Sequence, residues 1–388
     1  MAEHRWVLLL VSTFAGLTFS FCLQTVPPLM PVLVIELQIS FAQAGLLMGL
    51  FTLPALLVAL PSGLLLDRYG ARRVAVLAAV LLLLGNLLAA LVEGYLPLAL
   101  GRLIAGSGAA VLIVVAPQVV AAAFRQQGLG LAMGLFNVSV PLGTLLALNG
   151  LVLLLPEWGW QGAFWLDLLL SVLLLLLVLR FYPTHLSSDH VASASLWQAV
   201  RGVPVSLWWL SLCLALYAMG AMQFFSFAPA FYQSEGLGEA SAGLLASAPM
   251  LPSLLLAPLF GWLTDRFGFR WLFVLLGSVG AALVLLILPL HDLGGLFYPL
   301  LLGLFLALMV PTIYSMPPEL LPAESLGLAY GLLSMAFGVG ALLGALTVGW
   351  ARDGSGDYQL GFQWMALASV LAAGAILGVL KRGRVTPV

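Results

Sequence analysis

Long apolar stretches run along almost the whole chain, and each ends at positions that carry charge, proline or glycine. These breaks divide the sequence into twelve segments, at 7–35, 41–66, 73–93, 96–124, 129–155, 160–182, 205–233, 240–264, 270–290, 295–321, 326–350 and 359–380. A helix of about 20 mostly apolar residues is long enough to cross the hydrocarbon core of a bilayer. The pattern therefore predicts an all-α membrane protein with twelve transmembrane helices.

The longest polar stretch lies almost at the middle of the chain. It follows Tyr182 and contains four serines, an aspartate and two histidines before Pro204. We expect it to be a cytoplasmic linker at 183–204 between an N-terminal six-helix bundle at 1–182 and a C-terminal six-helix bundle at 205–388.

Composition supports a bilayer location and excludes a soluble domain. Hydrophobic residues make up 63% of the chain and charged residues only 7%, against about 25% charged in an ordinary soluble protein. The first apolar run follows Arg5 and could be a secretory signal, but it continues to about Val34 without a small-residue cleavage pattern, so we interpret it as the first transmembrane helix. Cys22 and Cys213 lie in apolar segments and indicate no disulfide framework.

Lysine and arginine predict the orientation, because positively charged loops are retained in the cytoplasm. With twelve helices, one side of the membrane carries Arg5, Arg68, Arg72, Arg73, Arg125, Arg180, Arg201, Arg266, Arg270, Lys381, Arg382 and Arg384. The opposite loops carry Arg352 as their single basic residue. Both termini are therefore expected in the cytoplasm.

An internal repeat relates the two halves of the chain. GLLLDRYGAR at 63–72 recurs as GWLTDRFGFR at 261–270, an offset of 198 residues, which also aligns AGLL at 44–47 with AGLL at 242–245. LGLAMGL at 129–135 matches LGLAYGL at 326–332 at an offset of 197. Two such matches at nearly equal offsets predict two parallel, pseudo-symmetric halves.

The repeated loop resembles the G-x-x-x-D-R-x-G-R-R/K signature of the major facilitator superfamily. Arg102-x-x-x-Gly106-x-Gly108-x-Ala110 resembles the family's R-x-x-x-G-x-G-x-A pattern. The resemblance covers essentially the whole chain. It implies two rocking bundles, a solute site near the middle of the membrane lined by helices 1, 4, 7 and 10, and alternating access between the two sides.

The signature loop supplies candidate gating residues, because in that family it latches the two halves when the outside is open. The candidates are Asp67, Arg68 and Arg72, with Asp265, Arg266 and Arg270 as their counterparts. Gly70 is expected to form a tight turn, and Asp67 could accept hydrogen bonds from a neighbouring helix N-terminus. Alternatively, the arginines only set the topology. The second loop is less basic, since Trp271 stands where the first has Arg73.

Two ionisable residues lie deep inside predicted helices, where a charge is costly unless it is paired or hydrated. At 1.5 Å per residue, Arg102 and Asp167 both lie about 10 Å from the outer end of their helices. A buried pair would explain both charges. It could be a structural clamp within the first bundle, or a functional element in which Arg102 binds an anion or responds to protonation of Asp167.

Neutral polar residues complete the predicted solute site. Gln24 and Gln223 occupy similar depths on helices 1 and 7, and we expect Pro27, Pro28 and Pro229 to bend these helices just beyond the glutamines. Asn137, Tyr217 and Tyr314 could also reach a central cavity. The phenylalanines of helix 7, at 224, 225, 227 and 231, are more typical of packing or of a lipid-facing surface.

These features favour a secondary transporter, by symport or antiport, of a small neutral or monoanionic solute. Arg102 alone offers a deep cation, so multiply charged solutes fit poorly, and resemblance to bacterial cyanate- and nitrate-type carriers favours uptake. Efflux of apolar compounds is the alternative, although Val140 stands where drug–proton antiporters usually have a glycine before the proline. Proton coupling would require Asp167; if Arg102 keeps it ionised, facilitated diffusion stays open.

Other classes of protein fit less well. The four histidines lie outside the middles of the predicted helices, and the sequence has no metal cluster, catalytic serine set or phosphate-binding loop that would favour an enzyme. A non-transporting sensor with the same fold is a further alternative. We expect a monomer in the bacterial cytoplasmic membrane, whose partners are a small solute, lipid and possible coupling protons, with no cofactor and no nucleic acid.

Overall fold

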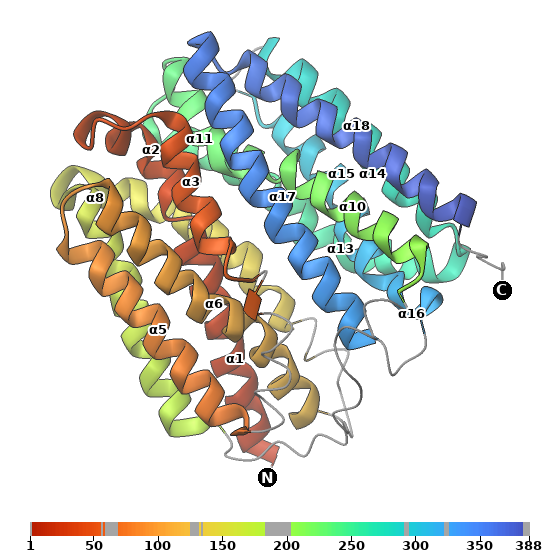
Figure 1. Ribbon diagram of the computed structural model, residues 1–388, viewed down its shortest axis with the longest axis horizontal. Coiled ribbons are helices and arrows are strands. Elements are labelled where there is room, and N and C mark those ends of the chain that lie inside the picture. The colour runs from red at the N-terminus through yellow and green to blue at the C-terminus, as the bar shows by residue number, and fades with distance from the viewer. Residues whose placement is uncertain are drawn as a thin grey trace. The chain divides into compact units, whose positions relative to one another are not determined.

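The computed structural model describes residues 2–55, 57–58, 69–124, 132, 135–182, 203–290, 295–321 and 326–382. Its helices follow one another along the chain (Figure 1). They are α1 (Ala2–Leu23), α2 (Val26–Glu36), α3 (Phe41–Thr52), α5 (Ala71–Leu91), α6 (Tyr95–Ala123), α8 (Ser139–Phe181), α10 (Val205–Met219), α11 (Gln223–Ser234), α12 (Glu239–Ser247), α13 (Met250–Phe267), α14 (Arg270–Ile287), η1 (Leu288–Leu290), α15 (Phe297–Ser315), α16 (Pro317–Leu320), α17 (Leu326–Ser355) and α18 (Gln359–Arg382).

The prediction of an all-α membrane fold is confirmed. Within the described ranges, eleven helical stretches are long and apolar enough to cross a membrane, and Phe41–Thr52 is a shorter apolar helix. This shorter helix begins where the second span was predicted, and most of 53–66 lies outside the described residues. The fifth and sixth spans form one continuous element, α8, in which Gly159 (φ 62°) makes the turn between them.

Contacts between Cα atoms divide the chain into two compact units. Unit 1 comprises Met1–Ile39 and Leu50–Ala192, and unit 2 comprises Ser40–Gly49 and Ser193–Val388. The beginning of α3 therefore belongs to unit 2 although the segments on both sides of it belong to unit 1. The linker predicted at 183–204 lies outside the described residues except for its last two positions.

Unit 1 is built from helices that lie lengthwise against one another. α5 packs against α6 and α8, and α1 packs against α8 and α6. Small residues allow these close approaches: a Cβ atom at Gly85 would lie 2.2 Å from the backbone nitrogen of Ala105. In a membrane, where apolar side chains gain little by leaving lipid, such close backbone packing is a main source of helix association.

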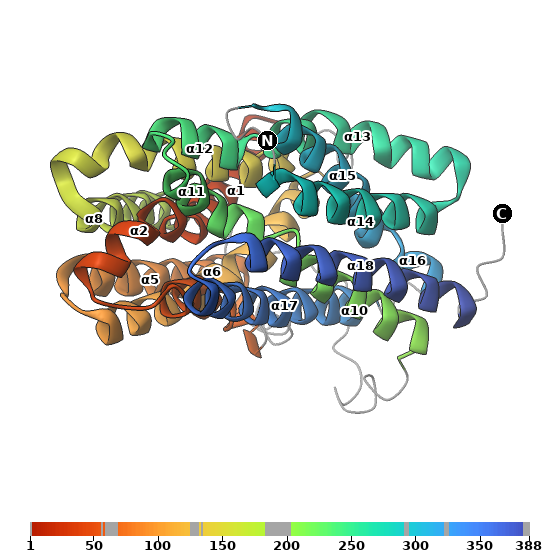
Figure 2. The same cartoon turned by 90° about the horizontal axis from the view of Figure 1, so that it is seen from above.

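Unit 2 repeats this scheme with different helices (Figure 2). α14 packs against α15 and α18, as α5 packs against α6 and α8, and α10 packs against α17 and α18. The third helix of each half thus contacts the fourth and the sixth of the same half. The pseudo-symmetry predicted from the repeat is therefore present in the helix packing.

One helix end differs from the prediction. The eleventh span was expected to end near residue 350, but α17 continues to Ser355 and includes Arg352 and Asp353 in its last turns. Gly356 has a φ of 77° and its backbone nitrogen donates to the Arg352 carbonyl at 3.1 Å. This left-handed glycine ends the helix, so the charged pair just before it is helical.

Candidate functional site

The first transmembrane helix is interrupted in unit 1. α1 ends at Leu23 and α2 begins at Val26, with Gln24 and Thr25 in a turn between them. Pro27 and Pro28 lack the N–H groups that would bond to the Leu23 and Gln24 carbonyls one turn earlier. The bend was predicted just beyond Gln24, but the break includes Gln24, because a proline disrupts the hydrogen bonds of the preceding turn.

Arg102 on α6 donates hydrogen bonds to carbonyls at this break. Its side chain is fully buried, with Nη1 2.7 Å from the Cys22 carbonyl oxygen and Nη2 3.4 Å from that of Leu23. The guanidinium carbon lies 4.3 Å from the ring centroid of Phe51, within the range of a cation–π interaction. Arg102 thus supplies donors to a carbonyl that Pro27 leaves without its helical partner.

Asp167 on α8 reaches the same break. The Thr25 hydroxyl lies 2.9 Å from Asp167 Oδ1 and 3.0 Å from the Phe21 carbonyl oxygen, so it donates to either acceptor. Asp167 Oδ2 is buried and has no hydrogen-bond partner in the part of the chain that the structure describes. Asp167 and Arg102 interact electrostatically. The two deep charges predicted from the sequence are therefore brought together.

A second layer of polar groups supports Asp167. Asn86 Nδ2 on α5 lies 2.9 Å from Ser171 Oγ and 3.4 Å from the Asp167 carbonyl oxygen, to which Ser171 Oγ donates at 2.7 Å. Asn86 Nδ2 also lies 3.5 Å from Cys22 Sγ. These groups were not predicted. An amide in the middle of the apolar segment 73–93 was the available signal for Asn86.

The glycines of the helix 4 pattern shape the surroundings of Arg102. A Cβ atom at Gly106 would lie 2.1 Å from the Phe51 carbonyl oxygen, and one at Gly108 would lie 2.2 Å from that of Ala78. Gly106 is one turn beyond Arg102, so the close approach that it permits places the Phe51 ring against the guanidinium. The pattern thus positions the aromatic partner of the buried cation.

Gln223 lies at the corresponding break in unit 2. α10 ends at Met219 and α11 begins at Gln223, so the bend precedes this glutamine and was predicted on the wrong side of it. Gly220 adopts a non-helical ψ of −96° there, and it permits close packing because a Cβ atom would lie 2.6 Å from the Met365 carbonyl oxygen. Pro229 lies inside α11.

The side-chain amide of Gln223 has a defined orientation. Nε2 donates to the Ala218 carbonyl at 2.9 Å and to the Ala341 carbonyl at 3.1 Å. Oε1 is then left as a buried acceptor without a partner among the described residues, and the same is true of Gln24 Oε1 in unit 1. The two glutamines predicted at equivalent depths thus occupy equivalent helix breaks, each with an unpaired carbonyl oxygen.

The remaining predicted site residues differ in their surroundings. Tyr217 is buried and Tyr314 half-buried in unit 2, whereas Asn137 is exposed. The four phenylalanines of helix 7 are all buried, and Phe231 contacts Phe362 with ring centroids 4.7 Å apart. They form packing contacts.

The predicted gating loops are partly described. Asp67 and Arg68 lie outside the described residues. Asp265 and Arg266 belong to α13, and their side chains lie outside the described part of the structure. The Arg72 guanidinium donates to the Leu179 carbonyl at the end of α8, and that of Arg270 donates to the Ser315 carbonyl at the end of α15. A cation at a helix C-terminus is favourable. Their gating role stays a prediction.

The turns of the repeated loop are alike in the two units. Gly70 has a φ of 79° and its counterpart Gly268 a φ of 69°, so the tight turn predicted at Gly70 is confirmed and recurs in unit 2. A side chain at either position would be strained.

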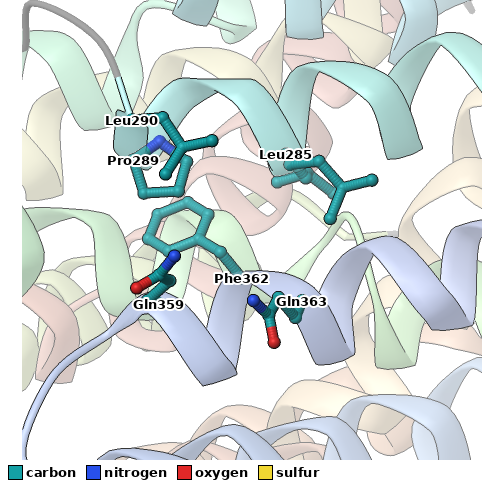
Figure 3. Close-up of a pocket in the computed structure, with 7 residues that line it drawn as sticks. Leu285, Pro289, Leu290, Gln359, Phe362 and Gln363 are labelled. Atoms are coloured by element: carbon teal, nitrogen blue, oxygen red, sulfur yellow. The ribbon is translucent and has the colours of Figure 1, made fainter.

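A surface pocket of about 150 Å³ lies elsewhere in unit 2, between the end of α14 with η1 and the beginning of α18 (Figure 3). Its walls are formed by Leu285, Leu286, Pro289, Leu290, Gln359, Phe362 and Gln363. They carry no charge and offer only two amides as polar groups. The pocket therefore differs in composition from the polar cluster around Arg102.

Comparison with known proteins identifies the family. The family model described as Major Facilitator Superfamily matches residues 9–241 and 232–387. The chain belongs to this superfamily. The family and its characterised members make this protein a multi-pass membrane transporter of small solutes rather than an enzyme.

The relatives are distant but cover most of the chain. The nitrite extrusion protein of Bacillus subtilis is 25% identical over 88% of this chain and 86% of its own length. Monocarboxylate transporter 11 of Mus musculus is 28% identical over 80% of this chain and 72% of its own length.

Solved structures share the fold. A mutant of the nucleoside transporter NupG superposes with a TM-score of 0.80 at 14% identity, covering 96% of this chain and 99% of that one. The D-xylose–proton symporter superposes with a TM-score of 0.77 at 18% identity, covering 97% of both chains. The predicted major facilitator fold is therefore confirmed.

Proposed function

We propose that this protein is a secondary transporter that carries a small monoanion across the bacterial cytoplasmic membrane by alternating access. The observation that carries the proposal is the fully buried guanidinium of Arg102 at the break of helix 1. Transporter sites typically lie where helices are interrupted near the middle of the membrane. The names of three relatives, for nitrite, monocarboxylate and L-galactonate transport, describe monoanions.

The chemistry of the break favours a side chain as the anion-binding group. A helix N-terminus usually binds anions through its first backbone N–H groups, but α2 has prolines at its second and third positions. The beginning of α2 is therefore poor in donors. Arg102 supplies the positive charge there, and its planar guanidinium matches the geometry of a carboxylate or a similar oxyanion.

The pairing of Arg102 with Asp167 suggests how protons couple to transport. Together an ionised carboxylate and a guanidinium have no net charge, so a bound anion would add an uncompensated negative charge to a buried site. A proton on Asp167 leaves the guanidinium charge for the anion. Monoanion and proton then bind together, which is electroneutral symport, and Asp167 Oδ2 is the acceptor for that proton.

Solute binding and exchange test the anion assignment. Purified protein is screened by thermal shift against nitrite, L-lactate and uncharged analogues, and hits are followed by isotope exchange in proteoliposomes. Binding to the native state raises the apparent melting temperature, so a monoanion is expected to do so in the wild type but not in Arg102→Gln. Lys381→Gln, which removes an exposed charge at the end of α18, is the control that keeps the shift.

The outcome that contradicts the anion site is a monoanion shift of equal size in Arg102→Gln. A shift by uncharged solutes alone would favour the neutral-solute alternative, and one by apolar drug-like compounds would favour efflux. A purified protein that binds a solute but exchanges none would favour a sensor.

Asp167→Asn tests proton coupling. Uptake of the monoanion driven by an inward proton gradient is expected to be lost, because an amide cannot release a proton, whereas exchange of labelled for unlabelled anion without a gradient is retained. Persisting gradient-driven uptake in this variant would place the coupling proton elsewhere.

We further propose that the transporter functions as a monomer with both termini in the cytoplasm.

A further inference from the structure

The beginning of α3 is capped by a residue from the far end of the sequence. Asp353 Oδ1 accepts from the Phe41 backbone nitrogen at 2.8 Å, and Asp353 Oδ2 accepts from that of Ala42 at 2.9 Å. Both carboxylate oxygens are thus used on successive N–H groups of one helix. A carboxylate is favourable at this end of a helix, where the dipole is positive.

Local residues satisfy the other donors of this helix end. Ser40 Oγ accepts from the Gln43 backbone nitrogen at 3.1 Å, and Gln43 Oε1 accepts from the Ser40 backbone nitrogen at 2.9 Å. This is a reciprocal capping box. It leaves the N–H groups of Phe41 and Ala42, and these are the two groups that Asp353 caps.

Aromatic contacts surround the cap. The guanidinium carbon of Arg352 lies 5.0 Å from the ring centroid of Phe41 and 4.6 Å from that of Tyr358. The two rings meet edge to face with centroids 5.9 Å apart. Burial raises the pKa of Tyr358 to about 12, so its ring stays uncharged and available for the cation–π contact.

Small residues bring α3 and α17 into backbone contact below the cap. A Cβ atom at Gly349 would lie 2.4 Å from the Ala42 Cα atom, and one at Gly45 would lie 2.7 Å from the Ala345 carbonyl oxygen. The contact extends along about two turns, since a Cβ atom at Gly49 would lie 2.5 Å from Leu342 Cδ1. The two helices fit each other closely where the cap forms.

The sequence places α3 in the first half of the repeat, yet Ser40–Gly49 belong to unit 2 while Leu50 and the residues after it belong to unit 1. Gly349 and Asp353 are also four residues apart, the spacing of Gly63 and Asp67 and of Gly261 and Asp265. The signature spacing thus occurs a third time in the sequence, at the end of α17.

We infer that Asp353 is a releasable latch, which holds the outer end of α3 against α17 in one state of the transport cycle and lets it go in the other. The inference rests on the proposed alternating access and orientation. One of the two hydrogen bonds of this cap is exposed and the other half-buried, which suits this role, because water can replace Asp353 at the two N–H groups when the helices separate. A buried apolar contact would be costlier to open.

Thiol labelling measures the latch directly. Ala345 is 1% exposed against Gly45, so the Ala345→Cys variant reports separation of α17 from α3. A membrane-impermeant maleimide is added to the outside of intact cells, and the parent protein with its two buried cysteines gives the background. Asp353→Ala is expected to raise the labelling rate about fivefold, the equilibrium effect of losing a helix cap, and Asp353→Asn to raise it less.

Asp357→Asn is the matched control. Asp357 Oδ1 accepts from the Gln359 backbone nitrogen at 2.9 Å and lies 3.3 Å from Ser355 Oγ. This variant therefore removes the same charge four residues further along the chain, from a carboxylate that bonds within its own turn. Its labelling rate is expected to match that of the unsubstituted reporter. If Asp353→Ala fails to accumulate in the membrane, Asp353→Asn decides the result, because it keeps the shape of the side chain and one acceptor oxygen.

Equal labelling of the Asp353 variants and the Asp357→Asn control would overturn the latch, as would labelling only from the cytoplasmic side. The measurement needs no solute. A failed latch therefore leaves the monoanion shift and exchange intact, whereas a failed anion assignment leaves the labelling result intact.

Discussion

A guanidinium inside a membrane bundle is tolerated only where its donors meet acceptors. At Arg102 the acceptors are the Cys22 and Leu23 carbonyls, and Pro27 accounts for one of them. The proline pair and the arginine therefore explain each other: the break exposes carbonyls, and the arginine satisfies them. This makes the structural-clamp and anion-site interpretations compatible rather than exclusive.

Arg102→Lys separates the two roles. Lysine keeps the charge but loses the planar fork that bridges two carbonyls and lies over Phe51. We expect the free energy of unfolding to fall by about 1–3 kcal/mol, as for other lost charge-assisted hydrogen bonds. A monoanion should still raise the melting temperature of this variant. Arg102→Gln should lose both. This division would be contradicted if Arg102→Lys kept the stability of the wild type but lost the increase in melting temperature on addition of the monoanion.

Asn86→Leu tests the layer behind Asp167. The change removes the donor to Ser171 Oγ and leaves buried polar atoms short of a partner, so we expect a loss of about 1–2 kcal/mol, the range found for polar contacts between membrane helices. The measurement is thermal unfolding in detergent. Ser107→Ala is the control, since the Ser107 hydroxyl donates to the Leu103 carbonyl of its own helix; equal losses in both variants would argue against a supporting role for Asn86.

The sequence predicts the depth of a residue better than its direction around a bundle. The shared level of Arg102 and Asp167 follows from the rise per residue of two helices that start on the same side. An amide in an apolar segment marks Asn86, but the partners of Thr25 and Asn86 could not be predicted, because their helices are apolar on all sides and show no amphipathic face that would indicate where a side chain points.

At the scale of elements, helix breaks and close approaches organise each unit. Most span limits could be predicted, since charged and glycine-bearing turns mark them in the sequence. The end of α17 could not, because Arg352 and Asp353 look like loop residues until their contacts with Phe41 and Ala42 are known. The helix breaks were placed in the right helices but shifted. In the first helix Pro27 and Pro28 disrupt the turn before them, whereas in the seventh the break lies at Gly220 and Pro229 stays inside α11.

Gly106→Ala tests the packing role of the helix 4 pattern. The added methyl group would lie 2.1 Å from a backbone oxygen at Phe51, so α3 or α6 must shift, and we expect a loss of about 1–3 kcal/mol, as for overpacking in other interiors. Thermal unfolding measures it. Gly150→Ala is the matched control, because no atom lies within 4 Å of a Cβ there and alanine is the better helix former; a destabilised control or an unaffected Gly106→Ala would contradict the packing role.

At the scale of the whole molecule, the repeat in the sequence predicts how each unit is built. Matching motifs at 63–72 and 261–270 imply matching helix order, and the packing of the third helix on the fourth and sixth is the same in both units. Chemistry does not follow this symmetry. In the described helices the deep charges lie in unit 1, while unit 2 offers Gln223, Tyr217 and a phenylalanine cluster.

Reporter fusions test the number of crossings and the orientation together. Twelve crossings place both termini on one side, and the arginine distribution places that side in the cytoplasm. We expect a green fluorescent protein at the C-terminus to fluoresce and alkaline phosphatase there to be inactive. Phosphatase fused after Gly356, in the turn between α17 and α18, should be active because that turn lies outside. The fusions decide the second span in particular: if 41–66 did not cross the membrane, every later segment would be inverted, and the phosphatase would be active at the C-terminus and inactive after Gly356.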